Sequence, residues 1–477
     1  MNAILDLQTE TELTRLDTLF ATQQAHFRAN PNSSCEERLK DLEILRSLIV
    51  NYKDRLVEAV AEDYGHRSTF DTLISDISGT LHSLEYTRKN LKKWMKPSKR
   101  SAGLMLAPSK AYVHYQPIGV VGIIVPWNFP IGLSLSPLLT ALATGNTAML
   151  KMSEFTPKTN AVLKTMLAEG FAESKVALIE GEVEVATRFS QLPFNHIIFT
   201  GSTAVGKHIM RAASANLTPV TLELGGKSPT IIGPDFDVQQ AVERIAFAKS
   251  INSGQACVAP DYVLMPAEKV TEFIDAYKAY FNSMFKDGIN SKDYTSIVNQ
   301  RQYQRLKSVL KDASDKGAII DPVRPVAFDD NRHRMIPHLV TGVTDQMTVM
   351  QEELFGPILP IIGYQSVDEA HQYVLDHDRP LALYIISNDK ALQERFVTNT
   401  LSGGVCINDL LMQVAVDDAP FGGNGPSGIG HYHGPEGFKT LSHAKTVLNR
   451  GSINFTKLLH PPYDTWFKKT IIRKIGG

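Results

Sequence analysis

From Val120 onward, short apolar runs alternate with longer amphipathic segments, and this alternation constrains the fold more than any other feature of the chain. The apolar runs, such as VVGIIV, HIIFT and VTLEL, are rich in Val, Ile and Leu and have the length of strands. Continuous apolar strands separated by helices are typical of a parallel sheet covered on both faces. The segment therefore predicts a doubly wound α/β domain, in which ligands bind beyond the carboxyl ends of the strands.

The same alternation restarts after Gly226, with the apolar runs SPTIIG, YVLMP, ILPIIGY and LALYIIS. Amphipathic segments such as AVERIAFAKSI and RQYQRLKSVLKDASDKG separate these runs. We therefore predict a second α/β domain. Residues 1 to about 98 instead carry apolar residues at helical spacing, including Leu39, Leu42 and Leu45, and predict helices.

The composition argues against several kinds of partner. The chain has 477 residues and a net charge of -1, which gives no reason to expect nucleic acid or an anionic membrane. Its three cysteines, Cys35, Cys257 and Cys406, cannot build a disulfide framework and lack the spacing of metal ligands. We therefore expect a cytoplasmic protein that binds no metal.

The sequence also predicts no transmembrane segment. The longest apolar stretch, from Ile118 to Leu150, is interrupted by three prolines, so it predicts a buried strand, a loop and a buried helix. The N-terminus is polar and acidic and has no signal-peptide pattern. Near the other end, Trp466–Ile475 mixes apolar and basic residues as a short interfacial helix does. We favour packing of this tail on a dimer over peripheral contact with a membrane.

One cysteine stands in a motif that suggests covalent chemistry. Cys257 lies in SGQACVAP, between a glycine and a proline, and the motif ELGGK, which begins at Glu223, precedes it. A thiol can attack a carbonyl carbon, and a carboxylate can later take a proton from water. These are two halves of one mechanism, although a lone cysteine is more often a small buried apolar residue.

Two further motifs follow predicted strands of the first domain. TGSTAVG, which contains Gly201, opens a helix, and the free N–H groups of a helix start favour a phosphate. A tight turn without a ligand is equally compatible with it. In PWNFP, the amide of Asn128 could donate to a developing oxyanion. The alternative is a rigid turn with a capping asparagine.

Two acidic motifs have the positions of cofactor contacts. Lys151 and Glu154, in KMSE, come at the end of a predicted strand and could reach the ribose hydroxyls of a dinucleotide. A surface ion pair is the alternative. Glu353 and Phe355, in EELFGP, could contact a ribose and a nicotinamide ring. An acidic pair at a helix end is the alternative there.

In their order along the chain, PWNFP, KMSE, FTGSTAVGK, ELGGK, GQACVAP, EELFGP and PFGGNGPSG resemble the aldehyde dehydrogenase superfamily. The resemblance runs from about Gln116 to Lys445. The helical N-terminus and the strings GQACVAPDYVL and GHYHG resemble the class 3 branch of this superfamily, and within it the bacterial enzymes that act on coniferyl aldehyde.

This resemblance implies a role for each motif. Cys257 would attack the aldehyde carbon, and Asn128 with the backbone N–H of Cys257 would hold the oxyanion. Glu223 would activate the water that hydrolyses the resulting thioester. The cofactor would be NAD, with NADP as a second choice. Its contacts would be Lys151 and Glu154 at the adenosine ribose, Gly201 and Ser202 at the pyrophosphate, Gly225 beside the cofactor, Glu353 and Phe355 at the nicotinamide end, and Trp127.

The resemblance also implies how the chain is organised. We expect an aldehyde dehydrogenase-like α/β fold, with two doubly wound domains and a small bridging flap that pairs two subunits into a homodimer. The expected parts are the N-terminal helices of the cofactor-binding domain at 1–97, a bridging segment at 98–118, a Rossmann-like core at 119–224, a catalytic domain at 225–420, and a C-terminal loop, return strand and dimer-contact tail at 421–477.

The sequence departs from the family pattern at two positions. Met152 replaces the usual proline of KMSE, which leaves Lys151 and Glu154 in place. Gln413 stands where class 3 members often carry histidine, which affects the contacts of the substrate tunnel. His431 and His433, in HYHG, are spaced like metal ligands, but no carboxylate or cysteine accompanies them, and we interpret them as loop residues.

We therefore expect an NAD(P)-dependent dehydrogenase that oxidises an aromatic or medium-chain aldehyde to the acid. Three alternatives are a broad dehydrogenase of fatty aldehydes, an acylating enzyme that passes the thioester to coenzyme A, and a catalytically silent protein on the same fold. Glu223 argues against the second, because deacylation by water needs a base. The joint presence of Cys257, Asn128 and Glu223 argues against the third.

Replacement of Glu154 by Gln tests the cofactor choice. A carboxylate can accept hydrogen bonds from both ribose hydroxyls of NAD but repels the 2′-phosphate of NADP, whereas the flexible Lys151 serves either ligand. We expect the wild type to prefer NAD and Glu154→Gln to raise kcat/KM for NADP more than for NAD. Steady-state kinetics with both cofactors measure this ratio, and an unchanged ratio would show that Glu154 does not set the preference.

Overall fold

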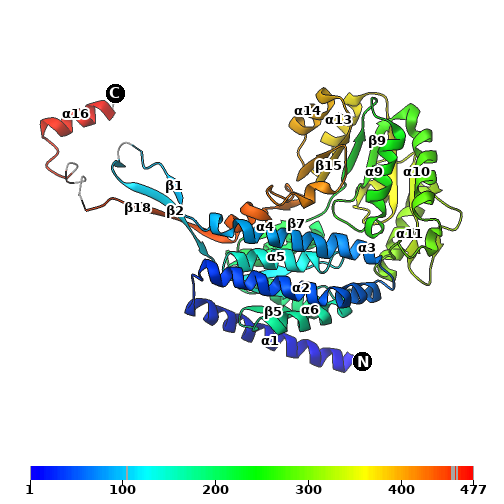
Figure 1. The fold of residues 1–477 in the computed structure, drawn as a ribbon. Coiled ribbons are helices and arrows are strands. Elements are labelled where there is room, and N and C mark those ends of the chain that lie inside the picture. The colour runs from blue at the N-terminus through cyan, green and yellow to red at the C-terminus, as the bar shows by residue number, and fades with distance from the viewer. Residues whose placement is uncertain (1, 104–105, 453–456, 458–459, 476–477) are drawn as a thin grey trace.

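The computed structural model describes residues 2–103, 106–452, 457 and 460–475 (Figure 1). The N-terminal helices are α1 (Asn2–Ala29), α2 (Cys35–Asp63), α3 (Thr69–Asp71), the π-helical η1 (Thr72–Ser78) and α4 (Gly79–Trp94). Helix α2 begins with a capping box, in which Ser34 and Glu37 each bond the other's backbone N–H. Its apolar stripe, with Leu42, Leu45 and Ile49, is fully buried against the first sheet.

The first sheet has six strands in the order β17-β7-β6-β3-β4-β5. Only β17 runs antiparallel to its neighbour. In sheet order, the strands are Gly428–Ile429, Val220–Glu223, His196–Thr200, Val120–Ile124, Thr147–Lys151 and Val176–Ile179. The connecting helices are α5 (Gly132–Ala143), α6 (Pro157–Gly170), α7 (Val183–Gln191) and α8 (Thr203–Ser214).

Side chains that alternate along β3 belong to two different cores. Val121 and Ile123 pack into the core shared with α2, α4, α5 and α6. Val120 and Ile124 pack on the opposite face, with α1, α7 and α8. In a strand buried on both faces, the side chains that point to either face are apolar. The sequence of such a strand is therefore a continuous apolar run.

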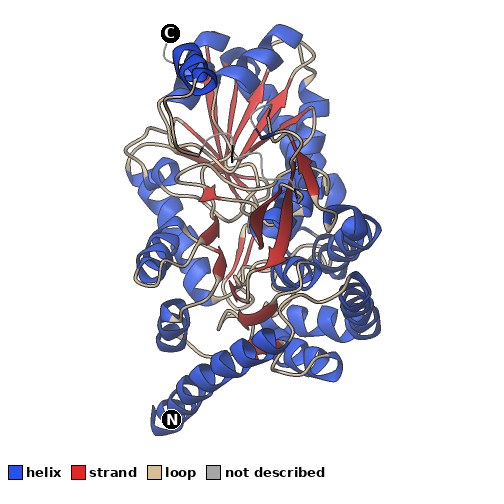
Figure 2. Ribbon diagram, turned by 90° about the vertical axis from the view of Figure 1, so that its left-hand side faces the viewer, coloured by secondary structure: helices blue, strands red, loops and turns tan. Residues whose placement is uncertain are grey.

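The second sheet has seven strands in the order β10-β13-β14-β9-β8-β15-β16, and only β10 is antiparallel. In this order, the strands are Ile319–Pro322, His338–Thr341, Ile358–Tyr364, Tyr262–Pro266, Pro229–Ile232, Ala382–Ile386 and Gly404–Ile407. Its helices are α9 (Val238–Ser250), α10 (Val270–Met284), α11 (Gln300–Asp315), α12 (Thr348–Gln351), α13 (Val367–Leu375) and α14 (Lys390–Asn399). Figure 2 shows both sheets with helices on either side.

A third, three-stranded sheet combines β1 (Ser98–Arg100), β2 (Lys110–Pro117) and β18 (Ser442–Asn449), all antiparallel. It projects from the body of the molecule, and α16 (Trp466–Ile475) lies at its far end (Figure 1). Before β18, the chain passes back over the first sheet through β17 and α15 (Gly434–Thr440). Smaller elements are η3 (Ile251–Gly254), η4 (Ala267–Lys269), η5 (Gly288–Asn290), η6 (Met412–Ala415), β11 (Phe328–Asp329) and β12 (Arg334–Met335).

These sheets confirm the prediction of an α/β fold with parallel sheets. Every strand and helix that the apolar alternation predicted is present. The strands β10, β13 and β16 were not predicted from the sequence. Within the described part of the chain, no helix is both long enough and apolar enough to cross a membrane.

A buried ion pair lies between the N-terminal helices and the first domain. Arg67 Nη2 is 2.9 Å from Asp76 Oδ2, and both side chains are fully buried. Arg67 Nη1 also donates to the main-chain oxygen of Asn128, at 2.6 Å. Asp76 Oδ1 accepts from the backbone N–H of Gly132, at 2.8 Å. Burial raises the pKa of Asp76 to about 6, while the charge of Arg67 acts in the opposite direction. Each member of the pair is therefore also fixed by a hydrogen bond to the backbone of the first domain.

Replacement of Arg67 by Met removes one partner and leaves a buried carboxylate uncompensated. We expect a loss of about 3–5 kcal/mol in the free energy of unfolding. The matched control is Arg188→Met, because Arg188 forms an exposed pair with Asp17 and should contribute about 1 kcal/mol or less. Urea unfolding of both variants measures the difference, and equal small losses would contradict the importance of the buried pair.

Candidate active site

The predicted site residues of the first domain gather at one edge of its sheet. Glu223 is the last residue of β7, and Lys151 is the last residue of β4. The PWNFP loop follows β3, and the TGSTAVG loop follows β6. Since β7, β6, β3 and β4 are parallel neighbours, all four motifs meet at the carboxyl edge, where ligands of doubly wound sheets bind. Cys257 comes from the second domain, in the loop between η3 and β9.

The turn before Cys257 has an unusual backbone. Asn252, Ser253 and Gly254 all have positive φ, at 49°, 53° and 73°. Non-glycine residues avoid this left-handed region, at a cost on the order of 1 kcal/mol each. A side chain at Gly254 would meet the carbonyl of Gly356, so the third position requires glycine. The strained residues therefore lie just before Cys257, the candidate nucleophile.

Hydrogen bonds from several segments hold this turn. The backbone N–H of Asn252 donates to Asp71 Oδ2 at 3.0 Å, and Ser253 Oγ donates to the carbonyl of Thr295. The buried Gln255 side chain donates to the carbonyl of Ser296 at 3.0 Å. The cysteine loop is thus fixed to the N-terminal segment and to the loop before α11.

Asn128 is fixed through its backbone and its side chain. Its carbonyl oxygen accepts from Arg67 at 2.6 Å, Tyr64 at 3.1 Å and Asn252 at 3.0 Å. Its Nδ2 donates to the carbonyl of Gln255 at 3.2 Å. An amide nitrogen carries two hydrogens, and one acceptor is present among the described residues. The second N–H is therefore available to another acceptor beside the cysteine loop.

Three ionisable groups interact around the cysteine. Burial raises the pKa of the Cys257 thiol to about 12, and the charges of Glu353 and Glu223 add to this effect. Glu223 is 3% exposed, and neither of its carboxylate oxygens has a hydrogen-bond partner among the residues that the structure describes. Burial raises its pKa well above its ordinary value. Burial also raises the pKa of Glu353 to about 8, while a backbone N–H from Gly226 lowers it.

The two glutamates differ in what surrounds them. A side chain at Gly225 would collide with the Glu353 carboxylate, so the glycine of ELGGK makes room for it. Glu353 therefore lies against the backbone of Gly225, two residues after Glu223. Its charge also interacts with those of Asp261, Lys227 and Arg305. Glu223 has only burial as the cause of its shift, which indicates a dry environment.

The remaining predicted residues fit a dinucleotide. The Ser202 side chain caps α8 by accepting from the backbone N–H of Val205, and α8 has 12 residues, so its N-terminus can hold an anion. Lys151 is 2% exposed, and its Nζ donates to the carbonyl of Met152 at 2.7 Å. Burial lowers the pKa of Lys151, and the charge of Glu154 raises it. The Glu154 side chain is exposed at the same edge.

Two aromatic residues approach each other across the domain boundary. The rings of Trp127 and Phe355 lie 5.2 Å apart, edge to face at 82°. Phe355 has a φ of 47°, which places it among the few non-glycine residues in the left-handed region. Gly201 donates its backbone N–H to the carbonyl of Glu223 at 3.0 Å, which ties the TGSTAVG loop to β7.

The sequence did not indicate some residues that shape the site. Tyr64 and Arg67 lie between helices, in a segment without periodicity, and bond the carbonyl of Asn128. The charges of Glu223 and Cys257 also reach the buried hydroxyl of Tyr432. Arginine is mostly exposed in folded proteins, so an arginine in an aperiodic segment gave no sequence signal for this group. Gln413, which the sequence placed near the substrate, donates to Tyr384 Oη at 3.1 Å.

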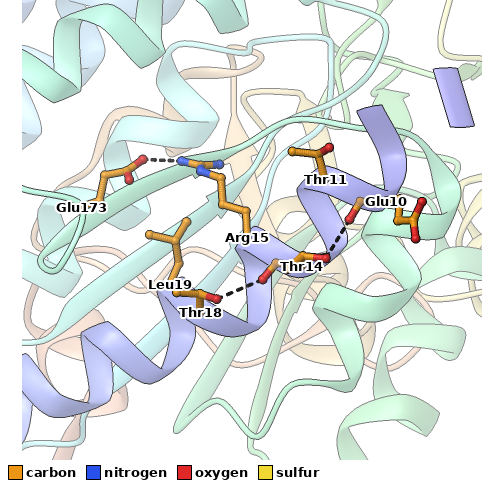
Figure 3. A pocket seen from close by; sticks show the side chains of 7 residues that line it. All are labelled: Glu10, Thr11, Thr14, Arg15, Thr18, Leu19 and Glu173. Atoms are coloured by element: carbon orange, nitrogen blue, oxygen red, sulfur yellow. Dashed lines mark hydrogen bonds and ion pairs between the residues drawn. The ribbon is translucent and has the colours of Figure 1, made fainter. Parts of the chain in front are cut away.

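Neither a metal cluster nor the hollow beside α1 adds a second site among the described residues. Among the described residues, no group of three or more His, Cys, Asp or Glu side chains could hold a metal ion. Figure 3 shows an open hollow between α1 and Glu173, where Arg15 forms an ion pair with that glutamate. None of the predicted site residues lines this hollow.

Replacement of Glu223 by Gln should stabilise the fold increasingly as pH rises. Below about pH 4.5, the carboxyl is protonated in the folded and the unfolded chain. Above it, the unfolded chain ionises while burial keeps the native carboxyl neutral, so wild-type stability falls by about 1.4 kcal/mol per pH unit until the native pKa is reached. Thermal unfolding at about pH 5 and pH 8, with the exposed Glu184→Gln as control, measures this trend. A stability difference independent of pH would contradict it.

The sequence matches the model of the aldehyde dehydrogenase family over residues 5–447. It is 49% identical to a probable coniferyl aldehyde dehydrogenase of Pseudomonas aeruginosa over 467 residues, which cover 98% of this chain and 97% of the relative. It is 42% identical to a coniferyl aldehyde dehydrogenase of a Pseudomonas species, with 92% of each chain covered.

Solved structures agree with these relatives. The substrate-bound AldH of Staphylococcus aureus matches with a TM-score of 0.91 and 37% identity, over 97% of this chain and 99% of that one. An aldehyde dehydrogenase of Mycobacterium tuberculosis in complex with NAD+ matches with a TM-score of 0.81 and 27% identity, over 91% and 90%. With the family model covering nearly the whole chain, the protein belongs to the aldehyde dehydrogenase family.

Proposed function

We propose that Cys257, Asn128 and Glu223 carry out the NAD(P)-dependent oxidation of an aromatic aldehyde of the coniferyl type to its carboxylic acid. The observation that carries this proposal is the meeting of three separate motifs. Asn128 Nδ2 bonds the cysteine loop at Gln255, and the charge of Glu223 acts on the Cys257 thiol. A nucleophile, an oxyanion donor and a base thus occupy one buried place.

The first step is attack of sulfur on the aldehyde carbon. The thiol is neutral at rest, because burial and the two neighbouring carboxylates disfavour a thiolate. Its proton must therefore pass to a water molecule in the site as the C–S bond forms. The carbonyl oxygen becomes an oxyanion, and the free N–H of Asn128 and the backbone N–H of Cys257 donate to it. The hydrogen bonds on the Asn128 carbonyl fix the donor before the charge develops.

NAD is the cofactor that the residues at the carboxyl edge fit. Lys151 and Glu154 would hold the adenosine ribose, and Gly201 and Ser202 would hold the pyrophosphate at the start of α8. The nicotinamide end would be lined by Glu353, Phe355, Trp127 and Gly225. When bound, the cofactor accepts the hydride of the tetrahedral adduct, which leaves a thioester on Cys257.

Glu223 acts in the second half of the reaction. It takes a proton from water as the water oxygen attacks the thioester carbon, and the C–S bond then breaks to give the acid. Burial raises its pKa, so the carboxyl rests mainly in its neutral form, and its anion is a strong base once it forms. The same base argues against transfer of the acyl group to coenzyme A, and the intact triad argues against a catalytically silent protein.

The aromatic substrate follows from the relatives. Two of them are named as coniferyl aldehyde dehydrogenases and align over at least 92% of this chain. Gln413 bonds Tyr384, whose hydroxyl donates to the carbonyl of Val258, so this polar side chain lies next to the nucleophile loop. A phenolic aldehyde offers a hydroxyl to such a group, which an aliphatic aldehyde lacks.

We also infer a homodimer, a cytoplasmic location and the domain division at 97, 118, 224 and 420. The projecting sheet β1-β2-β18 has an exposed edge strand on each side, which suits pairing with a second subunit. Cys35, Cys257 and Cys406 are all free thiols, as in a reducing compartment. All strands of the second sheet follow residue 224, and all strands of the first sheet except the returning β17 precede it, which supports that boundary.

Cys257→Ala should abolish oxidation of coniferyl aldehyde while leaving NAD affinity within about threefold of wild type, because the thiol forms the only covalent bond to substrate. Cys35→Ala and Cys406→Ala are the matched controls and should keep wild-type turnover. Absorbance of reduced cofactor, with coniferyl aldehyde, benzaldehyde and hexanal compared, measures both activity and substrate class. Turnover in Cys257→Ala would refute the assignment, and a preference for hexanal would refute the aromatic substrate.

A further inference from the structure

The base Glu223 lacks an evident way to release the proton that it takes from water. Both of its carboxylate oxygens are buried and have no hydrogen-bond partner among the described residues. Its side chain is 3% exposed. A carboxyl in a dry site holds its proton tightly, and a base that keeps its proton cannot serve a second turnover. Over one turnover, the proton that the thiol loses and the proton taken from water exceed by one the proton that the Cys257 thiolate takes back, so one proton must leave this buried site for solvent.

A histidine of the returning C-terminal loop lies beside Glu223. The point where a Gly422 side chain would begin is 3.2 Å from Glu223 Oε1 and 2.6 Å from His431 Nδ1. The two atoms are thus within about 6 Å of each other, a span that one water molecule covers with two hydrogen bonds. The same point lies 2.2 Å from the carbonyl oxygen of Gly430, so only glycine fits at position 422, and that oxygen is a third polar atom beside the other two.

His431 connects the buried site with the surface. Its Nδ1 is buried and, within the described part of the chain, has no hydrogen-bond partner, like both oxygens of Glu223. The residue as a whole is partly exposed, and only this one of its two ring nitrogens is both buried and unpartnered. Buried polar atoms without partners are rare in folded proteins and call for an explanation. Two of them facing one gap suggest a shared water.

His433, which lies two residues after His431 in the same loop, has ring contacts that account for its position. The ring of His433 stacks on Phe421, with centroids 5.3 Å apart and an angle of 20°, and it contacts Tyr432 at 4.4 Å. Those contacts account for His433 as a packed residue. The ionisable groups around the gap are Cys257 and Tyr432, which interact with Glu223, and His433, which interacts with His431.

We propose that His431 is a positioning and proton-relay residue that carries the deacylation proton from Glu223 to solvent. This inference rests on the proposed role of Glu223 as the deacylating base. After hydrolysis, the proton on Glu223 passes to a bridging water, which gives one of its own protons to Nδ1 of the neutral imidazole. The imidazolium then loses its Nε2 proton to solvent, and Glu223 is again a carboxylate. No electrons are exchanged. The ring ends with its proton on Nδ1, and it accepts again only after it turns, gives that proton to solvent and regains one on Nε2.

His431→Ala tests the relay by separating the two halves of the reaction. Hydride transfer precedes the proposed step, so the variant should release a burst of reduced cofactor equal to the number of active sites. Its steady-state turnover should then fall by at least about tenfold, because a lost proton transfer slows deacylation. Millimolar imidazole should restore turnover, and pyrazole, which has the same shape but is a far weaker base, should not.

The controls separate this proposal from folding and from the proposed function. His443→Ala, at an exposed position on β18, should match the wild type with and without imidazole. His431→Gln serves if the alanine variant does not fold. Unchanged turnover, a slow turnover that imidazole does not restore, or a burst lost together with turnover would each overturn the relay. Failure of the wild type to reduce NAD with any aldehyde would instead overturn the proposed function.

Discussion

The main-chain carbonyl of Asn128 is the point at which three parts of the chain meet. It accepts hydrogen bonds from Arg67, Tyr64 and Asn252, which come from the N-terminal segment and from the turn before the nucleophile. The side chain of the same residue bonds the cysteine loop from the other direction. One peptide group therefore sets the distance between the oxyanion donor and Cys257. The buried Arg67–Asp76 pair supports that peptide group and has no contact with the cysteine itself.

This arrangement explains how the structure maintains a strained turn. Asn252 and Ser253 adopt left-handed backbone angles that cost free energy, and their hydrogen bonds to Asp71 and Thr295 offset this cost. Because these partners belong to other segments, the turn cannot relax unless the N-terminal segment also moves. The N-terminal helices thus contribute to catalytic geometry although the motifs of the family lie elsewhere in the chain.

The sequence predicted the fold well where burial on both faces left a clear pattern. The strands β3 and β6 are continuous apolar runs, and both were predicted from that property. The edge strand β10 is half-exposed and contains Asp321 and Pro322, so it lacks that pattern. β16 is only partly buried and begins with glycine, which favours strands weakly. Local composition could not predict these strands, because pairing with neighbours far along the chain stabilises them.

The residues of the site also divide into those that the sequence indicated and those that only the fold reveals. Motifs could indicate Cys257, Glu223 and Asn128, since their chemistry is visible in the residue types. They could not indicate Arg67, because its role depends on a carbonyl 61 residues away that only the fold brings near. His431 was interpreted as a loop residue, and no spacing in the sequence relates it to Glu223. Only the fold brings both residues near Gly422, in a loop whose strand β17 pairs with β7.

The burial of Glu223 has two opposite consequences for the enzyme. Removal of water raises the pKa of the carboxyl and makes its anion a stronger base toward the attacking water. The same removal of water disfavours the ionised form at rest and closes the direct path for the proton to solvent. Exposure of Glu223 to water would open a path for the proton, but it would also make the carboxylate a weaker base. A partly exposed group next to a fully buried base avoids this conflict, because the base stays dry while the proton leaves through its neighbour. The C-terminal loop, which passes beside Glu223 through β17 and then presents His431, is built in a way that satisfies both requirements.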